Sequence, residues 1–454
     1  MKKLLLLACF AAFVVGCGNK GNGELTGVQG REEWYQPDPF GMLFIPMGAF
    51  QMGPDDDDVP FAHTTKQKTV SVQAFYIDDT EISNNEYRQF VNWVRDSMAY
   101  RLLIDNDAET YGIAQDEYGQ DIDPPLINWE AKIKWNEQES REVLEPLYLP
   151  QQERFYNRRE VDTRRLNYEY YWIDYKTASQ KQNRFIPEKS QDKNGKEYLN
   201  GKGSYTVNGR SGLDRSVFII KEVVNVFPDT LAWIHDFTYS FNEPMTQMYF
   251  WHPAYDDYPV VGVNWKQAKA FCVWRTNLLN SYLNSIGGAV VNDFRLPTET
   301  EWEYSSRGGL ALSPYPWGGP YIRNARGCFL GNFKPMRGSY IDDGGFHTVR
   351  IFSYNPNDYG LYCMAGNVSE WTSNAYDESA YDFSHDLNPN YEYAAQDNDP
   401  TVLKRKVIRG GSWKDVGYYM QTSSRSYEYQ DTAKCYVGFR CVMTYLGRAK
   451  DDNL

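Results

Sequence analysis

The most informative segment of this chain is Phe294-Arg295-Leu296-Pro297-Thr298-Glu299-Thr300-Glu301-Trp302-Glu303-Tyr304. Thr298 follows a proline and has Glu301 three residues later, which is the pattern of a capping box at the start of a helix. Acidic residues in a first helical turn also interact favourably with the helix dipole. We therefore predict a helix over residues 298–307 and interpret its acidic residues as structural.

Capping and alternation patterns predict the other regular elements. Residues 40–46 and 70–77 have the apolar alternation of short strands. Ser83 precedes apolar residues at helical spacing, and Glu86 completes a second capping box. Residues 265–275 predict an amphipathic helix. The rest of the C-terminal sequence is rich in Gly, Asn, Tyr and Trp and has few periodic runs, which predicts a loop-rich α+β domain.

The residue composition of the sequence changes between residues 96 and 250. Asn-Gly pairs begin at positions 194, 200 and 208, and each predicts a hairpin turn. Residues 154–175 interleave five arginines with five tyrosines. Both residue types are favoured at protein interfaces. This region is therefore either a partner-binding insertion or additional scaffold, and the two readings are equally supported by the residues.

Composition excludes several functional classes. The 454 residues include 60 acidic and 47 basic side chains, for a formal net charge of −13. A nucleic-acid partner requires a basic surface, so we predict none. The chain has no CxxC pair, and its five histidines are scattered. These facts exclude zinc ribbons, thioredoxin-like redox motifs and local His-rich zinc motifs.

The first residues have the features of an export signal. Two lysines precede a 12-residue apolar run, Leu4–Val15, which is shorter than the about 20 residues of a membrane span. The run ends in Gly16-Cys17 and resembles a bacterial lipobox, which implies that residues 1–16 are removed and Cys17 is lipidated. Residues 17–37 then predict a flexible tether. The alternative is an ordinary signal peptide with an incidental cysteine.

Several short motifs follow one another in a distinctive order: residues 44–53, 75–84, 259–265 and 294–304, then Gly366-Asn367-Val368-Ser369-Glu370-Trp371-Thr372, Arg409-Gly410-Gly411-Ser412-Trp413 and Gly438-Phe439-Arg440-Cys441. In this order they resemble the formylglycine-generating-enzyme (sulfatase-modifying factor) family. The resemblance implies an α+β fold related to C-type lectins, loop-rich with little regular secondary structure. It covers residues 38–95 and 251–446, which are separated by an insertion at 96–250 and followed by a tail at 447–454.

The enzymes of that family bind copper through two active-site cysteines, three and eight residues after the serine of the Gly-Gly-Ser motif. Here those positions hold Asp415 and Met420. Copper(I) prefers thiolate ligands, and a carboxylate beside a thioether is a poor substitute. We therefore predict no catalytic residue, no catalytic cofactor and no enzymatic activity.

Structural features of the family carry over more fully. Cys272 and Cys441 match a family disulfide, which would close a loop of about 170 residues. A second family disulfide is missing, because its positions hold Ser306 and Arg425. Cys328, Cys363 and Cys435 have no assigned role.

The resemblance also implies structural calcium at two sites. The first would use Asn332, Phe333, Asp343 and Gly345, and the second would use Cys363, Gly366, Val368 and Glu370. Carboxylate, amide and carbonyl oxygens from loops suit a hard cation such as Ca²⁺. The alternative is that these residues only cap turns.

A narrower resemblance rests on the lipobox, the long insertion and the string at residues 237–246. Together these are similar to the gliding-motility lipoprotein K family of the type IX secretion system. That family implies an outer-membrane lipoprotein on the periplasmic side, which forms a ring of its own copies with a second periplasmic protein, the N-type subunit. The competing hypotheses are a lectin-like envelope binding protein and an active sulfatase-modifying-type cysteine oxidase, which Asp415 and Met420 disfavour.

Overall fold

The computed structural model describes residues 35–54, 66–116, 118–184, 187–191, 197–201, 205–207, 210–212, 214–236, 243–337, 341 and 345–447. The chain divides into a compact unit of residues 38–446 and a second unit formed by residues 1–37 and 447–454. Cys17, the predicted signal peptide and most of the predicted tether and tail lie outside the described residues. No described helix is long and apolar enough to cross a membrane.

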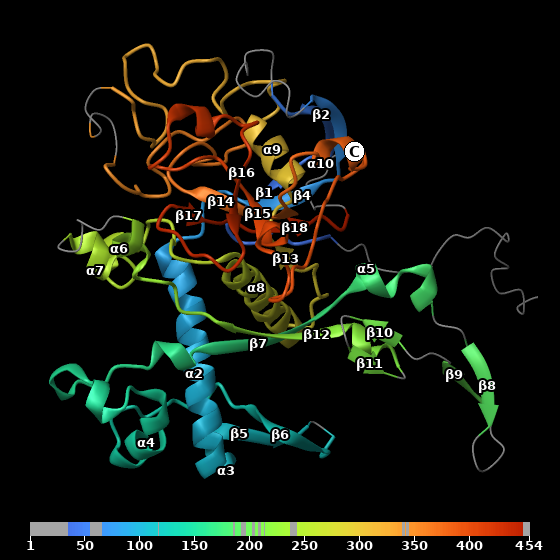
Figure 1. Cartoon of the computed structure of the whole chain (residues 1–454). Coiled ribbons are helices and arrows are strands. Elements are labelled where there is room, and N and C mark those ends of the chain that lie inside the picture. The colour runs from blue at the N-terminus through green and yellow to red at the C-terminus, as the bar shows by residue number, and fades with distance from the viewer. Residues whose placement is uncertain are drawn as a thin grey trace, which may run out of the picture. The chain divides into compact units, whose positions relative to one another are not determined.

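The unit of residues 38–446 contains two four-stranded sheets (Figure 1). The first is antiparallel, in the order β1 (Met42–Ile45), β4 (Phe75–Asp78), β18 (Val442–Thr444) and β13 (Phe294–Arg295). The second has the order β16 (Ser426–Tyr429), β15 (Arg405–Arg409), β14 (Ser369–Ala375) and β17 (Val437–Gly438), and only β14 and β17 run parallel. Since β4 pairs with both β1 and β18, strands from the two ends of the chain are joined in one sheet.

The predicted strand at residues 40–46 is confirmed as β1, but the one at residues 70–77 is divided. Its first half belongs to β3 (Lys68–Val72), which pairs with β2 (Gly48–Met52), and its second half is β4. The break falls at Gln73, whose amide donates to the side chain of Asn388 at 2.8 Å instead of joining a strand ladder. The apolar alternation of the sequence continues through Gln73, so this pattern alone does not reveal the break between the two strands.

Two helices begin at the capping residues that the sequence predicts. α2 (Asn84–Asn106) starts after Ser83, and α9 (Glu299–Arg307) starts after Thr298, each with a complete capping box. α8 (Trp265–Ser285) has a third capping box, from Asn264 to Gln267, and continues ten residues beyond the predicted helix. The predicted domain boundary at residue 95 falls inside α2, so this helix extends from the first part of the domain into the middle region.

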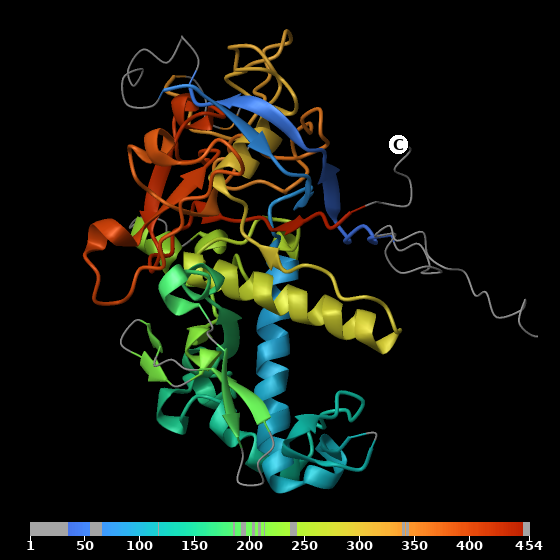
Figure 2. The same ribbon diagram turned by 90° about the vertical axis from the view of Figure 1, so that its right-hand side faces the viewer.

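The main core lies where α2 and α8 cross, beside the sheet that contains β18 (Figure 2). The Tyr87 ring stacks on Phe271 with 5.7 Å between centroids, and Phe90 packs against Trp274 at 5.2 Å. Phe439, from the strand-rich C-terminal segment, meets Phe271 edge-on at 5.4 Å. Burying each such ring contributes about 1.5–3 kcal/mol. This contact fixes the two long helices to the strands.

The middle region is built from short elements, several of which surround the C-terminal half of α2 (Figures 1 and 2). They are α3 (Ala108–Tyr111), β5 (Gly112–Gln115), β6 (Asp121–Ile127), α4 (Gln138–Val143), β7 (Asn167–Ile173), α5 (Tyr175–Ala178), β8 (Pro187–Gln191), β9 (Glu197–Gly201), β10 (Tyr205–Val207), β11 (Arg210–Gly212), β12 (Ile219–Asn225), α6 (Ala232–Asp236) and α7 (Pro244–Met248). β7 and β12 pair as a two-stranded antiparallel ribbon that packs on α8.

The remaining elements are short. They are α10 (Ala380–Phe383) and the 3-10 segments Glu145–Leu147, Gln151–Glu153, Phe155–Asn157, Thr163–Arg165, Lys181–Asn183, Arg215–Phe218, Pro253–Tyr255, Thr401–Lys404 and Gly417–Met420.

Two of the three Asn-Gly pairs fall, in the sequence, between strands that pair with each other. The pair at 194 separates the paired strands β8 and β9, and the pair at 208 separates β10 and β11. Asn194, Gly195, Asn208 and Gly209 themselves lie outside the described residues. The prediction for the pair at 200 is wrong, because Asn200 and Gly201 are the last residues of strand β9 and pair with Glu188 and Pro187.

Candidate functional site

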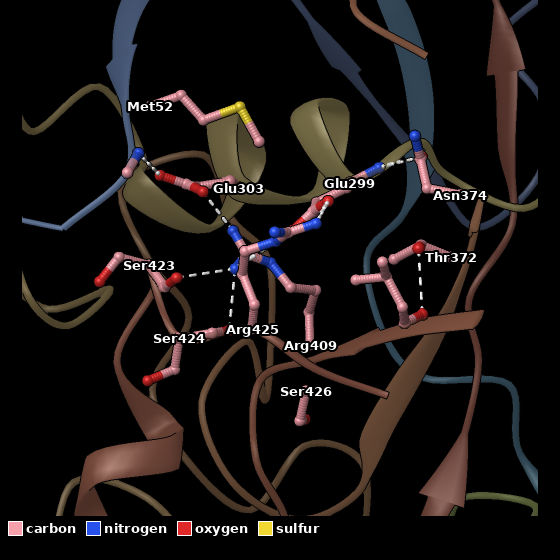
Figure 3. A network of polar contacts seen from close by, with 12 residues as sticks. Met52, Glu299, Glu303, Thr372, Asn374, Arg409, Ser423, Ser424, Arg425 and Ser426 are labelled. Carbon is pink, nitrogen blue, oxygen red and sulfur yellow. Dashed lines mark hydrogen bonds and ion pairs between the residues drawn. The ribbon is translucent and has the colours of Figure 1, made fainter. Parts of the chain in front are cut away.

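The acidic segment of α9 lies in a buried network of charges (Figure 3). The Glu303 carboxylate pairs with Arg409, and its other oxygen accepts from Arg307 at 2.7 Å and from the Gly53 amide at 2.9 Å. The Glu299 carboxylate pairs with Arg425 at 2.5 Å. Glu303, Arg307 and Arg409 are all at most 3% exposed. Each glutamate of this segment pairs with an arginine, which agrees with the structural interpretation of the segment.

A second buried network adjoins the first. Arg440 donates to both oxygens of Glu370, at 2.7 and 2.6 Å, and Trp302 donates to the same carboxylate at 2.7 Å. The Trp302 ring also lies 5.6 Å from the Arg409 guanidinium, so it separates the two networks. The first network has one more arginine than glutamate, and the second has one more glutamate, Glu81. The two networks together therefore contain four arginines and four glutamates.

Glu81 is the least favourably placed of these carboxylates. Burial and the nearby Glu370 carboxylate raise its pKa, and Arg440 together with the hydrogen bond from Asn367 opposes that rise only in part. The Asn367 side chain donates to Glu81 at 2.6 Å, and the Val368 amide donates to it at 3.3 Å. Arg440 was not identified from sequence, although an arginine within an apolar run is the signal of a buried ion pair.

The position that corresponds to the family's catalytic cysteines lies after β15. Gly410 and Gly411 have φ angles of +93° and +66°, and a Cβ atom on Gly411 would lie 2.7 Å from the Tyr419 carbonyl, so this turn requires glycine. The turn brings Ser412 to Asp415, whose carboxylate accepts the Ser412 hydroxyl at 2.5 Å. Burial raises the pKa of Asp415, and this hydrogen bond offsets part of the rise.

Met420 fills the second catalytic position with an apolar side chain. It is fully buried and packs with Tyr315, Phe333 and Ala365. A neighbouring cavity of about 20 Å³, lined partly by Cys363 and Ala365, has room for about one water molecule. A substrate peptide would not reach the Met420 sulfur without displacing this packing.

Residues of the middle region cover the same position from outside. Trp233 of α6 stacks on Trp413 with 5.8 Å between ring centroids. The His347 ring packs edge-on against Trp413 at 4.7 Å, and its Nε2 atom lies 3.0 Å from the Glu243 carboxylate, within hydrogen-bonding distance. All three rings are at most 7% exposed. No sequence pattern indicated that Trp233 would lie beside the Gly-Gly-Ser motif, because 180 residues separate Trp233 from Trp413.

Cys363 and Cys435, two thiols near this position, have surroundings that favour their protonated form. Burial raises the pKa of Cys363 and of Cys435, and in both cases neighbouring carboxylates raise it further. Cys435 lies 3.2 Å from the Asp236 carboxylate, and Cys363 lies 3.4 Å from the Ile351 carbonyl. A protonated thiol is a weak nucleophile and a weak metal ligand. Neither cysteine replaces the two that the catalytic positions lack.

The predicted disulfide residues are brought together. The sulfur atoms of Cys272, on α8, and Cys441, beside β18, lie 3.5 Å apart in the core, and both side chains are buried. The five described cysteines are present as thiols, so the disulfide itself stays a prediction.

We expect oxidised wild-type protein to carry one bond between Cys272 and Cys441. Cys272→Ser should then lower the free energy of unfolding by about 2–5 kcal/mol, because the unfolded chain loses the constraint of a long closed loop. Peptide mapping without reductant checks the bond, and urea unfolding of both proteins checks the stability. Cys328→Ser is the matched control. An unbonded pair in protein isolated without reductant would contradict the expectation.

The predicted calcium ligands are only partly assembled. The structure places Asn332 beside Gly366, since the Asn367 amide donates to the Asn332 carbonyl at 2.8 Å. The Asn332 side-chain amide donates to the His347 carbonyl at 2.7 Å. Asp343, the carboxylate of the first set, lies outside the described residues. Phe333 is buried in the cluster around Met420, and Gly345 lies two residues before His347.

The second calcium set has suitable oxygens, but its carboxylate already has partners. Cys363, Gly366, Val368 and Glu370 are all buried or nearly so, and Cys363 and Gly366 have positive φ angles of 51° and 83°. A cation at Glu370 would share its two oxygens with Arg440 and Trp302. The described residues contain no group of three or more His, Cys, Asp or Glu that would hold a metal ion. Calcium at either set stays a prediction.

Comparison with known proteins agrees with the motifs. The inactive C-alpha-formylglycine-generating enzyme 2 of Bos taurus is 34% identical over 193 residues, which are 41% of this chain and 50% of that protein. The formylglycine-generating enzyme of Mus musculus is 32% identical over 199 residues, 42% of this chain and 46% of that protein. The chain thus spans about half the length of these relatives. The solved structure of PvdO from Pseudomonas aeruginosa aligns with 89% of this chain and 94% of its own, at 15% identity and a TM-score of 0.44.

A family model described as the sulfatase-modifying factor enzyme 1-like domain matches residues 32–208 and 151–445. These matches together extend over most of the chain, and the described residues have the mixed helix and sheet content of the predicted α+β fold. The chain therefore belongs to the family of sulfatase-modifying factor enzyme 1-like domains.

Proposed function

We propose that this protein is a non-enzymatic structural lipoprotein of the type IX secretion and gliding-motility machinery. In this proposal lipid on Cys17 anchors it to the periplasmic side of the outer membrane, and its copies form a ring with the N-type periplasmic subunit. The proposal rests on family membership, on the lipobox, and on the gliding-motility string at residues 237–246. It requires no catalytic cofactor and no nucleic acid.

The observation that carries the non-enzymatic part is the chemistry at the two catalytic positions. Asp415 bonds to Ser412, and Met420 is sealed in an apolar cluster. Oxidation of a substrate cysteine through a thiolate-bound copper ion needs thiolates, and neither position supplies one. The relatives include proteins named as inactive formylglycine-generating enzymes, which supports the same reading.

The proposed role of residues 96–250 is to contact other ring subunits. In this proposal they are an insertion in a loop-rich, lectin-related domain. Their surface supports the role, because Phe155, Tyr156, Tyr171 and Tyr175 are each at least 59% exposed. Tyrosine and phenylalanine are enriched at protein interfaces relative to the rest of the surface.

Electron microscopy and chemical crosslinking of the protein in its native envelope test the proposal. We expect rings that contain many copies of the chain, crosslinked both to one another and to a second periplasmic protein. A monomer that binds glycans on an array would favour a lectin-like binder instead. Copper-dependent turnover of a cysteine peptide by purified protein would overturn the non-enzymatic assignment.

Asp415→Ala is expected to leave type IX secretion at the wild-type level, because the proposal assigns this carboxylate no reaction. The substitution removes one hydrogen bond, and we expect a stability loss of about 0.5–1.5 kcal/mol. The amount of secreted cargo in the culture medium measures the first effect, and thermal unfolding measures the second. Complete loss of secretion by a folded Asp415→Ala protein would show that the old catalytic position has gained a new role.

A further inference from the structure

The middle region presents an aromatic projection at residues 155–156. Phe155 and Tyr156 are 72% and 85% exposed, and their rings contact each other edge-on at 4.7 Å. Tyr156 and Asn157 have φ angles of 51° and 56°, a left-handed conformation that non-glycine residues adopt at an energetic cost. Strain of this kind persists only where the surrounding structure holds the backbone in place.

The base of the projection supplies that support. Arg154 donates to the Leu149 carbonyl at 2.7 Å and pairs with Glu145, which also pairs with Arg159 at 2.8 Å. The Arg159 guanidinium lies 4.2 Å from the centre of the Tyr148 ring. Two arginines on either side of the projection are thus tied to one carboxylate. The backbone that carries the two rings is therefore fixed at its base, and pre-organisation of this kind lowers the entropic cost of binding.

A groove of about 490 Å³ lies along α2, between this helix, the 146–147 segment and the β7–β12 ribbon. Its apolar lining includes Trp93, Met98, Leu102, Leu147, Tyr168 and Val223. The floor is fixed by a hydrogen bond from Asn277 to the Tyr168 hydroxyl at 3.2 Å, and one wall by Arg165, which donates to the Pro146 carbonyl at 2.5 Å. A volume in the range of about 300–1,000 Å³ holds a ligand of drug size, so two aromatic side chains would fit.

The charges beside the projection and the groove are complementary. Arg158 follows the projection, and Asp105 lines the groove; neither forms an ion pair with any residue that the structure describes. Arg101 also lines the groove and forms no ion pair with a described residue. Its guanidinium would pack on the face of an inserted aromatic ring. In its own chain the projection is exposed, so it does not occupy the groove of the same copy.

We propose that the Phe155–Tyr156 projection of one copy inserts into the α2 groove of a second copy, with Arg158 facing the second copy's Asp105. The inference rests on the proposed function, because it identifies the contact that would build the ring. The two surfaces are different patches of one chain, so the contact is heterologous. Heterologous contacts leave one free patch at each end and continue into rings or filaments, whereas an isologous contact would stop at a dimer.

A mixing experiment on the full chain in detergent tests the contact. One variant carries Phe155→Ser with Tyr156→Ser, and another carries Val223→Arg in the groove; all three sites are exposed. Each variant alone should self-associate at least about tenfold more weakly than wild type, as for loss of a central aromatic contact. An equal mixture should form heterodimers but no larger species, since it contains one intact projection and one intact groove.

Tyr118→Ser is the matched control, because Tyr118 is 86% exposed and lies between the paired strands β5 and β6. This variant should self-associate as wild type does. A photo-crosslinking amino acid at position 155 should join peptides of residues 93–105 in a second, isotope-labelled copy. The proposed contact would be overturned if both variants associated as strongly as wild type, or if crosslinks formed only at other residues. A ring seen in the envelope would then have to be built by a different contact. Absence of any homo-oligomer in the envelope would instead overturn the proposed function itself.

Discussion

Glu303→Ala is expected to lower the free energy of unfolding by about 3–5 kcal/mol, because removing one partner of a buried ion pair leaves the others uncompensated. Glu303 is fully buried and lies beside Arg409 (Figure 3). It also binds Arg307 and the Gly53 amide. Its loss would leave the buried Arg307 guanidinium without its carboxylate, and it would leave Arg409 with only Glu299, 3.6 Å away. For a domain with a typical stability of about 5–15 kcal/mol, this is a large fraction of the total.

Urea unfolding followed by circular dichroism measures this effect. Glu137→Ala is the control, because Glu137 forms only an exposed pair with Lys134; its unfolding midpoint should match that of wild type. Glu303→Gln keeps hydrogen-bonding atoms and removes the charge, so it should fall between wild type and Glu303→Ala if charge and hydrogen bonding both contribute. A Glu303→Ala protein as stable as wild type would show that the network does not stabilise the fold.

The same network makes the fold sensitive to acid. Burial raises the pKa of Glu299, but the Arg425 and Arg409 guanidinium groups more than offset this, and the pKa ends below its ordinary value of 4.5. A carboxyl group with a lowered folded-state pKa stabilises the protein above its unfolded pKa and stops doing so as pH falls through the folded value. Stability should therefore be retained at neutral pH and decline below about pH 4.5.

Cys17→Ala is expected to move the protein from the membrane fraction to the soluble fraction, because the proposed anchor is the lipid on this residue. Acyl chains contribute about 0.8 kcal/mol of membrane affinity per buried CH₂ group, and no described helix would replace them. Fractionation with immunoblotting measures the effect. We also expect loss of secretion activity, since an unanchored copy would not hold a ring at the membrane.

Cys9→Ala is the matched control for this experiment. Cys9 lies in the apolar run of the same leader, so its replacement changes one cysteine without changing the lipobox. It should leave membrane fractionation unchanged. If Cys17→Ala protein stays in the membrane fraction after a carbonate wash, the lipoprotein proposal fails, whereas the family assignment from residues 32–445 is unaffected.

Local patterns predicted what local physics decides. The capping boxes at Ser83 and Thr298 depend on residues three positions apart, and both helices begin where these residues place them. Helix length and strand breaks were predicted less well. α8 runs on past residue 275 because its later residues pack on β13 and the β7–β12 ribbon, and the break at Gln73 depends on Asn388, 315 residues away.

The sequence by itself determined the family, the helix starts and the absence of thiols at positions 415 and 420, because each of these is a property of residue identity and order. Only the tertiary structure decided that Glu303 meets Arg409, that Trp233 covers Trp413, and that a groove opens along α2. These pairings join segments more than one hundred residues apart, or surfaces of separate elements. Which of many arginines a buried glutamate meets depends on how the sheets and helices pack, and no short-range pattern in the chain encodes that choice.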